Sequence, residues 1–342
     1  MPPVPEIQLQ QNHMQQHGFV YALVAAFVFL LAVGGYFIFR PTADVPGKVV
    51  VTAREFKPEG KIYLTLSPLG SNYTGIYSFD LAANTLTKLV GKDNTGSLTA
   101  HPAATSSLLL SSNIALDPTK TSISPLQIFS LSDQGVLKQI TNTASTFKRH
   151  PAYSESLGLY IYGAKAGAAS LGVNPNDFNI YTYKDGKEKL ITNGALPTLT
   201  PDGNSVVALR QDGLYLISLT DTTVQKIWGL DHGGSALNLQ FTISPSGKYI
   251  AWSIPNDGYI YIMTVDSWAP FKGAVTSKIE THAFWPVFSP DEEYLAYEQV
   301  DWTLPQPTNQ KLVIFDLKTP QKRVVQDLKD FDQQKMFVSG WR

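Results

Sequence analysis

The residues of this chain that are able to do chemistry are hydroxyl, imidazole and carboxyl side chains, because its 342 residues include no cysteine. The absence of cysteine excludes disulfides, thiol nucleophiles, thiolate metal sites and a lipid-modified cysteine anchor. Serine nucleophiles of many hydrolases sit in a G-x-S-x-G turn, and the sequence has no such pattern. Calcium loops of the D-x-D-x-D-G type and phosphate-binding P-loops are also absent.

The histidines and acids have the spacing of structural residues. His101 and His150 each precede a proline, and we interpret both as histidines that hydrogen-bond to a neighbouring loop. Asp202 and Asp291 stand in turn sequences, where a short carboxylate accepts hydrogen bonds from its own backbone. We therefore predict no catalytic residue, no metal ligand and no cofactor, and we expect the chain not to be an enzyme.

Residues suited to recognition lie in the longer connections. Trp268 and Trp302 stand in proline-containing segments, and an exposed loop tryptophan can anchor a partner. His232 lies in the Gly-rich sequence DHGGS, and Asn174 and Asp177 lie in the polar segment GVNPNDF. These five residues are our candidate partner-binding residues. The corresponding candidate loops are 164–178, 231–237, 267–278 and 301–310.

The elements that would position these loops are short strands in a repeating unit. The clearest copies read LTPDGNSVVAL (199–209), ISPSGKYIAWS (243–253) and FSPDEEYLAYE (288–298), and less regular copies span 100–112 and 149–163. Their prolines recur every 44 to 50 residues, at Pro102, Pro151, Pro201, Pro245 and Pro290. This period is typical of a four-stranded propeller blade. Further alternating segments follow each copy, such as FNIYTYKDGKEKLIT (178–192), which predicts a hairpin turn at 184–187.

The two ends of the repeat region complete the count of blades. Residues 60–90 supply three strands of a blade without the strand that should precede them. The final MFVSGWR (336–342) resembles the start of a repeat copy, so we predict that strand 337–341 closes the blade begun at Lys61. The sequence therefore predicts an all-β fold, a six-bladed β-propeller over 61–342, preceded by one transmembrane α-helix.

The units LTPDG, ISPSG and FSPDEEYLAY resemble the WD-repeat-like units of the TolB-type β-propellers, over about residues 60–342. The same unit occurs in prolyl oligopeptidases, but that family's catalytic residues have no positions here onto which they map. The TolB resemblance implies an exported, non-catalytic binding platform. The chain departs from that pattern by a hydrophobic anchor where a cleaved signal is expected and by the lack of a preceding α/β domain.

Residues 18–39 predict the membrane anchor, between a polar tail (1–17) and a linker (40–60). The segment has 22 residues without a charge, and as a helix it covers roughly 33 Å, enough for the hydrocarbon core. A cleaved signal peptide is the alternative, but the apolar stretch is too long and no basic residue precedes it. The basic residues that follow the span favour a cytoplasmic propeller by the positive-inside rule. The charged fraction of 16% and the TolB resemblance favour the extracytoplasmic side, which we predict.

The near balance of 27 basic and 28 acidic residues gives no global field that would attract nucleic acid. We expect the membrane, through 18–39, and a protein, a peptide or a cell-wall glycan as partners. The predicted function is a membrane-tethered, non-catalytic binding platform at the cell envelope. Two alternatives remain open: a structural subunit of an envelope assembly, and a hydrolase or lyase whose acids or histidines converge at the central channel.

Overall fold

The structure is a computed structural model. It describes residues 55–68, 75–90, 99–102, 107–113, 125–132, 134–143, 146–166, 174–230, 239–254, 258–280, 282–301, 310–319, 321–327 and 333–342. The predicted tail and membrane span, 1–17 and 18–39, lie outside these residues, as does most of the predicted linker. In the described ranges the one helix is η1 (Pro175–Asp177), and none there is long and apolar enough to cross a bilayer.

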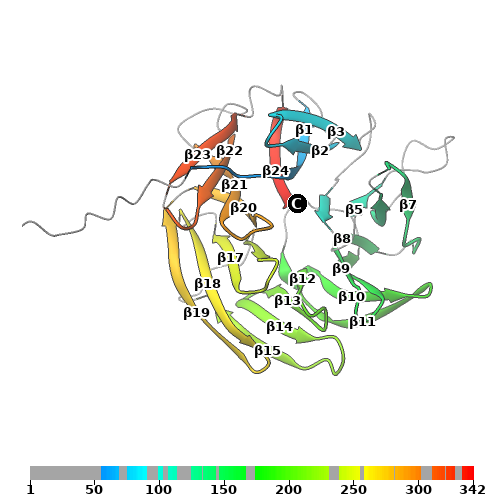
Figure 1. Ribbon diagram of the computed structural model, residues 1–342. Coiled ribbons are helices and arrows are strands. Elements are labelled where there is room, and N and C mark those ends of the chain that lie inside the picture. The colour runs from blue at the N-terminus through cyan, green and yellow to red at the C-terminus, as the bar shows by residue number, and fades with distance from the viewer. Residues whose placement is uncertain are drawn as a thin grey trace, which may run out of the picture. The chain divides into compact units, whose positions relative to one another are not determined.

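The described chain folds into six antiparallel sheets of four strands each, arranged around a central axis (Figure 1). Blade 1 contains β24 (Gln333–Trp341), β1 (Lys61–Pro68), β2 (Gly75–Asp80) and β3 (Thr85–Val90). Blade 2 contains β4 (Thr99–Pro102), β5 (Leu108–Ser112), β6 (Gln127–Leu131) and β7 (Leu137–Gln139). Blade 3 contains β8 (Thr146–Ser154), β9 (Leu159–Ala166), β10 (Asn179–Lys184) and β11 (Lys187–Asn193).

The remaining blades follow the same order from the innermost strand to the outermost. Blade 4 contains β12 (Ala195–Leu199), β13 (Ser205–Arg210), β14 (Gly213–Ser218) and β15 (Val224–Gly229). Blade 5 contains β16 (Gln240–Ile243), β17 (Tyr249–Ile254), β18 (Tyr259–Trp268) and β19 (Phe271–Glu280). Blade 6 contains β20 (Ala283–Phe288), β21 (Tyr294–Val300), β22 (Gln310–Asp316) and β23 (Lys322–Asp327). The prediction of an all-β, six-bladed propeller is confirmed.

The ring closes through the C-terminal strand, as predicted. β24 pairs antiparallel with β1 and places Trp341 opposite Ile62 and Met336 opposite Leu66. The backbone of Lys61 exchanges two hydrogen bonds with Arg342, at 2.6 and 3.0 Å. The indole Nε1 of Trp341 donates to the carbonyl of Glu59 at 2.8 Å. The last strand of the chain thus completes the first blade, which joins the two ends of the propeller.

The repeated Ser/Thr-Pro sequences form the turns that follow three inner strands. Thr200, Ser244 and Ser289 each accept, through the side-chain oxygen, a hydrogen bond from the backbone N–H five residues later, at 3.2, 3.0 and 2.9 Å. In two of these turns Asp202 and Asp291 accept a second backbone hydrogen bond, at 3.1 Å in both cases. The prediction that these acids are turn residues is confirmed.

The hairpin predicted at 184–187 is also present. Lys184 pairs with Lys187, and both turn residues, Asp185 and Gly186, have positive φ angles of 51° and 78°. Two-residue hairpin turns with positive φ match the right-handed twist of the strands, and Asp-Gly is a favoured pair for them. The sequence therefore fixes the register of β10 against β11.

The core consists of layers between neighbouring blades. Trp252 is fully buried between blades 4 and 5, where it contacts the rings of Trp228 and Tyr261 at 4.8 and 5.6 Å. Trp285 and Trp341 belong to the layer between blades 6 and 1. All three tryptophans thus pack between neighbouring blades. Phe56, at the end of the predicted linker, packs edge-on against Tyr294 in the same layer.

Candidate functional site: the central channel

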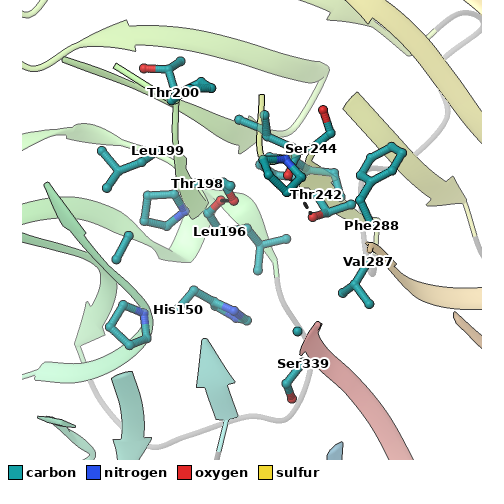
Figure 2. A pocket seen from close by; sticks show the side chains of 18 of the residues that line it. His150, Leu196, Thr198, Leu199, Thr200, Thr242, Ser244, Val287, Phe288 and Ser339 are labelled. Atoms are coloured by element: carbon teal, nitrogen blue, oxygen red, sulfur yellow. Dashed lines mark hydrogen bonds between the residues drawn. The ribbon is translucent and has the colours of Figure 1, made fainter. Parts of the chain in front are cut away.

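The inner strands enclose a cavity of about 730 Å³ on the central axis. Its wall is built from the inner strands of blades 1, 3, 4, 5 and 6 and from the turns that follow some of them. In Figure 2, the side chains of His150 and Leu196 come from two of these strands and lie beside the same open space. A cavity of this volume is in the range of small-molecule and peptide-group sites.

Three of the lining residues owe their position to the same backbone irregularity. His150, Leu196 and Trp285 have φ angles of 51°, 55° and 55°, in the left-handed region that favours glycine. Each precedes a proline and sits at a register shift in the ladder of its inner strand. A β-bulge adds a residue to one strand and turns its side chain in a new direction, and bulges are frequent beside functional sites. The bulges therefore direct these three side chains to the cavity wall.

The prolines of these bulges correct the predicted alignment of the repeats. The sequence pattern equates Pro151 with Pro201 and Pro290, as turn prolines between strands. In the structure Pro151 lies inside β8, and its counterparts are Pro197 in β12 and Pro286 in β20. Pro102 likewise belongs to strand β4. The proline signal is real, but it marks two different positions four residues apart.

A physical reason for proline at this inner position is the free edge of each inner strand. Every inner strand is the last strand of its sheet, so one side of its backbone has no partner strand and faces the channel. Proline has no N–H group to leave unpaired, and it is tolerated at sheet edges and bulges for that reason. A proline here also discourages a further strand from adding to the edge.

The wall contains both aromatic rings and hydroxyl groups. Trp285 and Phe337 contact each other edge-on with ring centroids 5.3 Å apart. Thr198 and Thr242 are wall residues within the inner strands. The hydroxyls of Ser154, Thr200 and Ser244 are bonded at the turns, and that of Ser339 lies 3.1 Å from Thr65 Oγ1. Aromatic faces with hydroxyls around them suit a ligand that has both apolar and hydrogen-bonding groups.

The acids of the wall lie at the turns. Glu155 is an exposed residue directly after β8, and Asp202 is an exposed residue in the turn that follows β12. Burial raises the pKa of Asp202, but hydrogen bonds from Thr200 and Asn204 lower it by more, so the net shift is downward. A carboxylate held ionised in this way is a poor proton donor. Among the described residues no group of three or more histidines and acids is placed to hold a metal ion.

A buried ionic network lies behind the cavity wall in blade 3. The Nζ atom of Lys148, a fully buried residue, lies 3.6 Å from Oε1 of Glu188 and hydrogen-bonds to Thr146 and to the carbonyl of Thr143. The same carboxylate oxygen accepts from Tyr162 Oη and Thr143 Oγ1, both at 2.6 Å. Burial lowers the pKa of Lys148, and Glu188 opposes that shift; burial also raises the pKa of Tyr162, with Glu188 adding to the rise.

None of the three predicted binding residues that the structure describes, Trp268, Asn174 and Asp177, lines this cavity. Trp268 ends strand β18, and its indole Nε1 donates to the carbonyl of Gly247 at 3.1 Å while its ring packs on Phe271. The predicted loop 267–278 is wrong, because most of it is strand β19 paired with β18. The Ala-Pro pair at 269–270 forms the hairpin turn between β18 and β19, and the predicted longer loop is absent there.

The other predicted residues divide into two groups. Asn174 caps η1 by accepting a hydrogen bond from Asn176 N at 3.2 Å, and its amide lies 3.4 Å from Oδ1 of Asp177. Both are therefore turn residues on the surface of blade 3. His232 and Trp302 lie outside the described residues, as do 231–238 and 302–309, so their proposed roles remain predictions.

Sequence reasoning missed the residues of the channel wall. His150 was interpreted as a loop-bonded histidine, and Leu196 and Trp285 were not connected with it. The signal that links them is short: an X-Pro pair four residues before the Ser/Thr of the turn, in HPAYS, LPTLT and WPVFS. It is visible once the Ser/Thr positions, and not the prolines, are aligned.

Comparison with known proteins gives a fold and no family. No family model and no curated protein sequence matches the chain. TolB from Acinetobacter baumannii superposes with a TM-score of 0.57 at 15% identity, over 82% of this chain and 66% of that one. A TolB from Agrobacterium tumefaciens gives 0.53 at 13% identity, over 84% and 99%. An oligogalacturonate lyase in complex with manganese gives 0.50 at 10% identity, over 79% and 86%. The chain is thus similar to TolB-type six-bladed propellers over most of its length, and that fold also occurs among enzymes.

Proposed function

We propose that this chain is a membrane-tethered, non-catalytic binding platform whose binding site is the central channel. The observation that carries the proposal is the set of three bulges at His150, Leu196 and Trp285. Non-glycine residues in the left-handed region cost about 1–3 kcal/mol each, and such strain tends to persist at functional sites. Strain repeated in three blades, always at the cavity wall, supports a selected recognition surface.

The chemistry of the wall supports binding over catalysis. Hydrolysis or elimination needs acids or histidines that converge on one point. The described wall offers one histidine on β8 and two carboxylates at the turns, with Asp202 engaged by its own turn. Aromatic, aliphatic and hydroxyl side chains form most of the remaining surface that we propose for recognition.

The tether and its side of the membrane rest on the sequence. Residues 18–39 have the length and composition of a spanning helix, and the propeller follows them. We propose the extracytoplasmic side because of the low charge of the chain and the likeness to TolB-type propellers. An envelope protein, a peptide or a cell-wall glycan is then the partner class. The predicted loops 231–237 and 301–310 remain candidates for additional contacts.

The channel is tested by filling it. Thr242→Trp places a large side chain on the cavity wall, whereas Val275→Trp makes the same kind of change on outer strand β19, where Val275 is 45% exposed. Partners are captured with the full chain solubilised from its own membrane. We expect Thr242→Trp to lose the partner that wild type and Val275→Trp retain, with circular dichroism confirming that both variants are folded. Equal capture by both variants would place binding outside the channel.

The tether is tested separately by protease accessibility. Digestion of the propeller in intact cells, or in spheroplasts if an outer membrane shields it, is expected for an extracytoplasmic domain. Protection until lysis would mean that the positive-inside count is right and that the partner is cytoplasmic. A structural subunit, the alternative reading, would co-purify with other membrane proteins regardless of the Thr242 substitution.

A further inference from the structure

One buried charge beside the cavity has no partner in the described structure. Arg149 is 7% exposed, and its Nη2 atom makes no hydrogen bond. No ion pair reaches it from any described residue. Its neighbour Lys148 differs, because Glu188 and three oxygens surround that ammonium group. Burial alone, without an acidic group to oppose it, lowers the pKa of Arg149.

The strand register places Arg149 close to the channel wall. It immediately precedes His150, which lines the cavity, and it pairs with Gly163 on β9. A Cβ atom on Gly163 would lie 3.5 Å from Pro197 and 3.6 Å from Phe178, so this sheet face looks toward blade 4. Pro197 is itself a wall residue. The absence of a side chain at Gly163 leaves room opposite the arginine.

A second cation lies on the same face of blade 3. Lys165, also 7% exposed, is two residues beyond Gly163 on β9 and is therefore the diagonal neighbour of Arg149. Its Nζ atom lies 5.6 Å from the ring centroid of Phe178. Two basic side chains thus share one buried face beside the wall that carries His150.

A buried guanidinium nitrogen without an acceptor, such as Nη2 of Arg149, is costly. Desolvating a charge costs several kcal/mol unless hydrogen bonds or a counter-charge replace the lost water. Arg149 and Lys165 are not among the residues that line the cavity, but buried cations directly behind its wall raise the electrostatic potential inside it. Arginine is the residue best suited to hold a carboxylate or phosphate, through two parallel hydrogen bonds. The missing partner of Arg149 therefore has a defined chemistry.

We propose that the channel binds an anionic ligand, whose carboxylate or phosphate group lies beside His150 and is held by Arg149 with Lys165. This inference rests on the proposed binding function and names the chemical class of its ligand. The aromatic pair Trp285–Phe337 and the wall hydroxyls then contact the neutral part of the ligand. An acidic sugar unit has both features, which makes sugar acids and sugar phosphates the natural probes.

The test compares three hexose probes with the full chain in detergent: glucuronate, glucose 1-phosphate and neutral glucose, at constant ionic strength. We expect either or both acids to raise the unfolding temperature in a saturable way at concentrations up to about 10 mM, while glucose has no effect. A response to glucuronate alone assigns a carboxylate ligand, and a response to glucose 1-phosphate alone assigns a phosphate. No response to either acid would overturn the proposal.

Two substitutions identify the site. Arg149→Met keeps the apolar length of the side chain and removes its charge, and we expect it to weaken acid binding at least tenfold. Because the charge that it removes is unpaired, the unfolding temperature without ligand should not fall below that of wild type. Lys189→Met makes a similar change on an exposed position of β11 and should leave binding unchanged. Acid binding that survives Arg149→Met would overturn the assignment.

Should Arg149→Met fail to fold, Arg149→Lys keeps the charge but loses the paired hydrogen bonds, and a tenfold loss of acid binding is again expected. This test and the channel-filling test fail in different ways. Loss of partner capture in Thr242→Trp together with no acid response would leave the channel as the binding site and reject only the anionic ligand. An acid response with partner capture unchanged in Thr242→Trp would keep the anionic ligand and reject the channel as the site of partner capture.

Discussion

The interface between blades 4 and 5 and the interface between blades 2 and 3 have opposite chemistry. The former is apolar and aromatic, centred on Trp252 with Trp228 and Tyr261 around it. In the latter, three buried hydrophobic residues accompany an ionic network around Lys148 and Glu188. Blades 4, 5 and 6 are also those whose sequences show the repeat most clearly, whereas blades 2 and 3 carry its less regular copies.

This difference separates an interface that is built for stability from the blade that carries the basic residues of the proposed ligand site. Apolar interfaces between blades contribute to stability in proportion to the area they bury. A buried ionic network contributes less, because desolvation offsets the attraction between the charges. Segments whose sequence departs from the regular repeat, or that bury charged residues, are expected at functional sites. The basic residues of β8 and the irregular repeat of blade 3 fit that expectation.

The largest effect is expected in the aromatic interface. Trp252→Ala removes a fully buried ring and should lower the free energy of unfolding by about 3–5 kcal/mol, measured by urea denaturation followed by circular dichroism. Trp252→Phe is the matched control. It keeps most of the apolar contact and removes an indole N–H that has no partner, so its cost should be much smaller. Equal losses in the two variants would contradict the packing role.

A buried acid in blade 6 provides a pH-dependent test. Burial raises the pKa of Glu298 well above its ordinary value, so between pH 4.5 and the raised pKa the folded state binds more protons than the unfolded state. Stability from this group is present below pH 4.5 and is lost as the pH rises. Glu298→Gln replaces the ionisable carboxyl group with a neutral amide. Relative to wild type it should stabilise the protein by up to about 1.4 kcal/mol per pH unit in that window. Unfolding curves of wild type and variant at pH 5 and 7 measure the difference; parallel pH dependence would reject the burial effect.

The ionic network should respond less. Glu188→Gln leaves hydrogen-bond acceptors for Tyr162 and Thr143 but removes the counter-charge of Lys148. We expect a loss of about 1–2 kcal/mol, at the lower end for buried pairs because Glu188 is partly exposed. Glu155→Gln, at an exposed turn, is the control and should change stability by less than about 0.5 kcal/mol. Similar values for the two variants would show that the network adds nothing to the interface.

The smallest effect concerns a residue that the sequence indicated for partner binding. Trp268→Phe loses the hydrogen bond to Gly247 and should cost about 0.5–1.5 kcal/mol in urea denaturation. Because its ring packs within blade 5, partner capture should equal that of wild type. Reduced capture by a fully folded Trp268→Phe variant would return this residue to the binding surface.

Sequence reasoning determined the fold in detail and the site hardly at all. Strand alternation, the period of the repeat and the incomplete first blade were sufficient for six blades and for closure by the C-terminal strand. The site escaped because its residues are marked by backbone irregularity. Nothing in the composition of HPAYS or WPVFS shows that His150 and Trp285 adopt positive φ angles and face one cavity from two blades. Arg149 escaped because burial of a charge depends on strands distant in sequence.

Aligning the prolines also hid the site. Pro151 and Pro201 seemed equivalent because both recur with nearly the same period, yet one belongs to a bulge and the other to a turn. The hydroxyl residues Ser154, Thr200 and Ser289 keep the correct register, since each bonds the backbone of the turn that it begins. The candidate loop 267–278, chosen for its tryptophan, had no such hydrogen bond to align it, and most of it is strand.

Thiol labelling tests the channel-binding function most directly, because the natural chain has no cysteine. Thr242→Cys places the single thiol on the channel wall, and Val275→Cys places it on outer strand β19. Both are treated with a membrane-impermeant maleimide, in intact cells (or in spheroplasts) and after purification. We predict that Val275→Cys is labelled in both settings, whereas Thr242→Cys is labelled when pure and protected in cells, where the partner occupies the channel. Equal labelling of Thr242→Cys in both settings would contradict a channel-binding function, and protection of Val275→Cys until lysis would contradict the extracytoplasmic position.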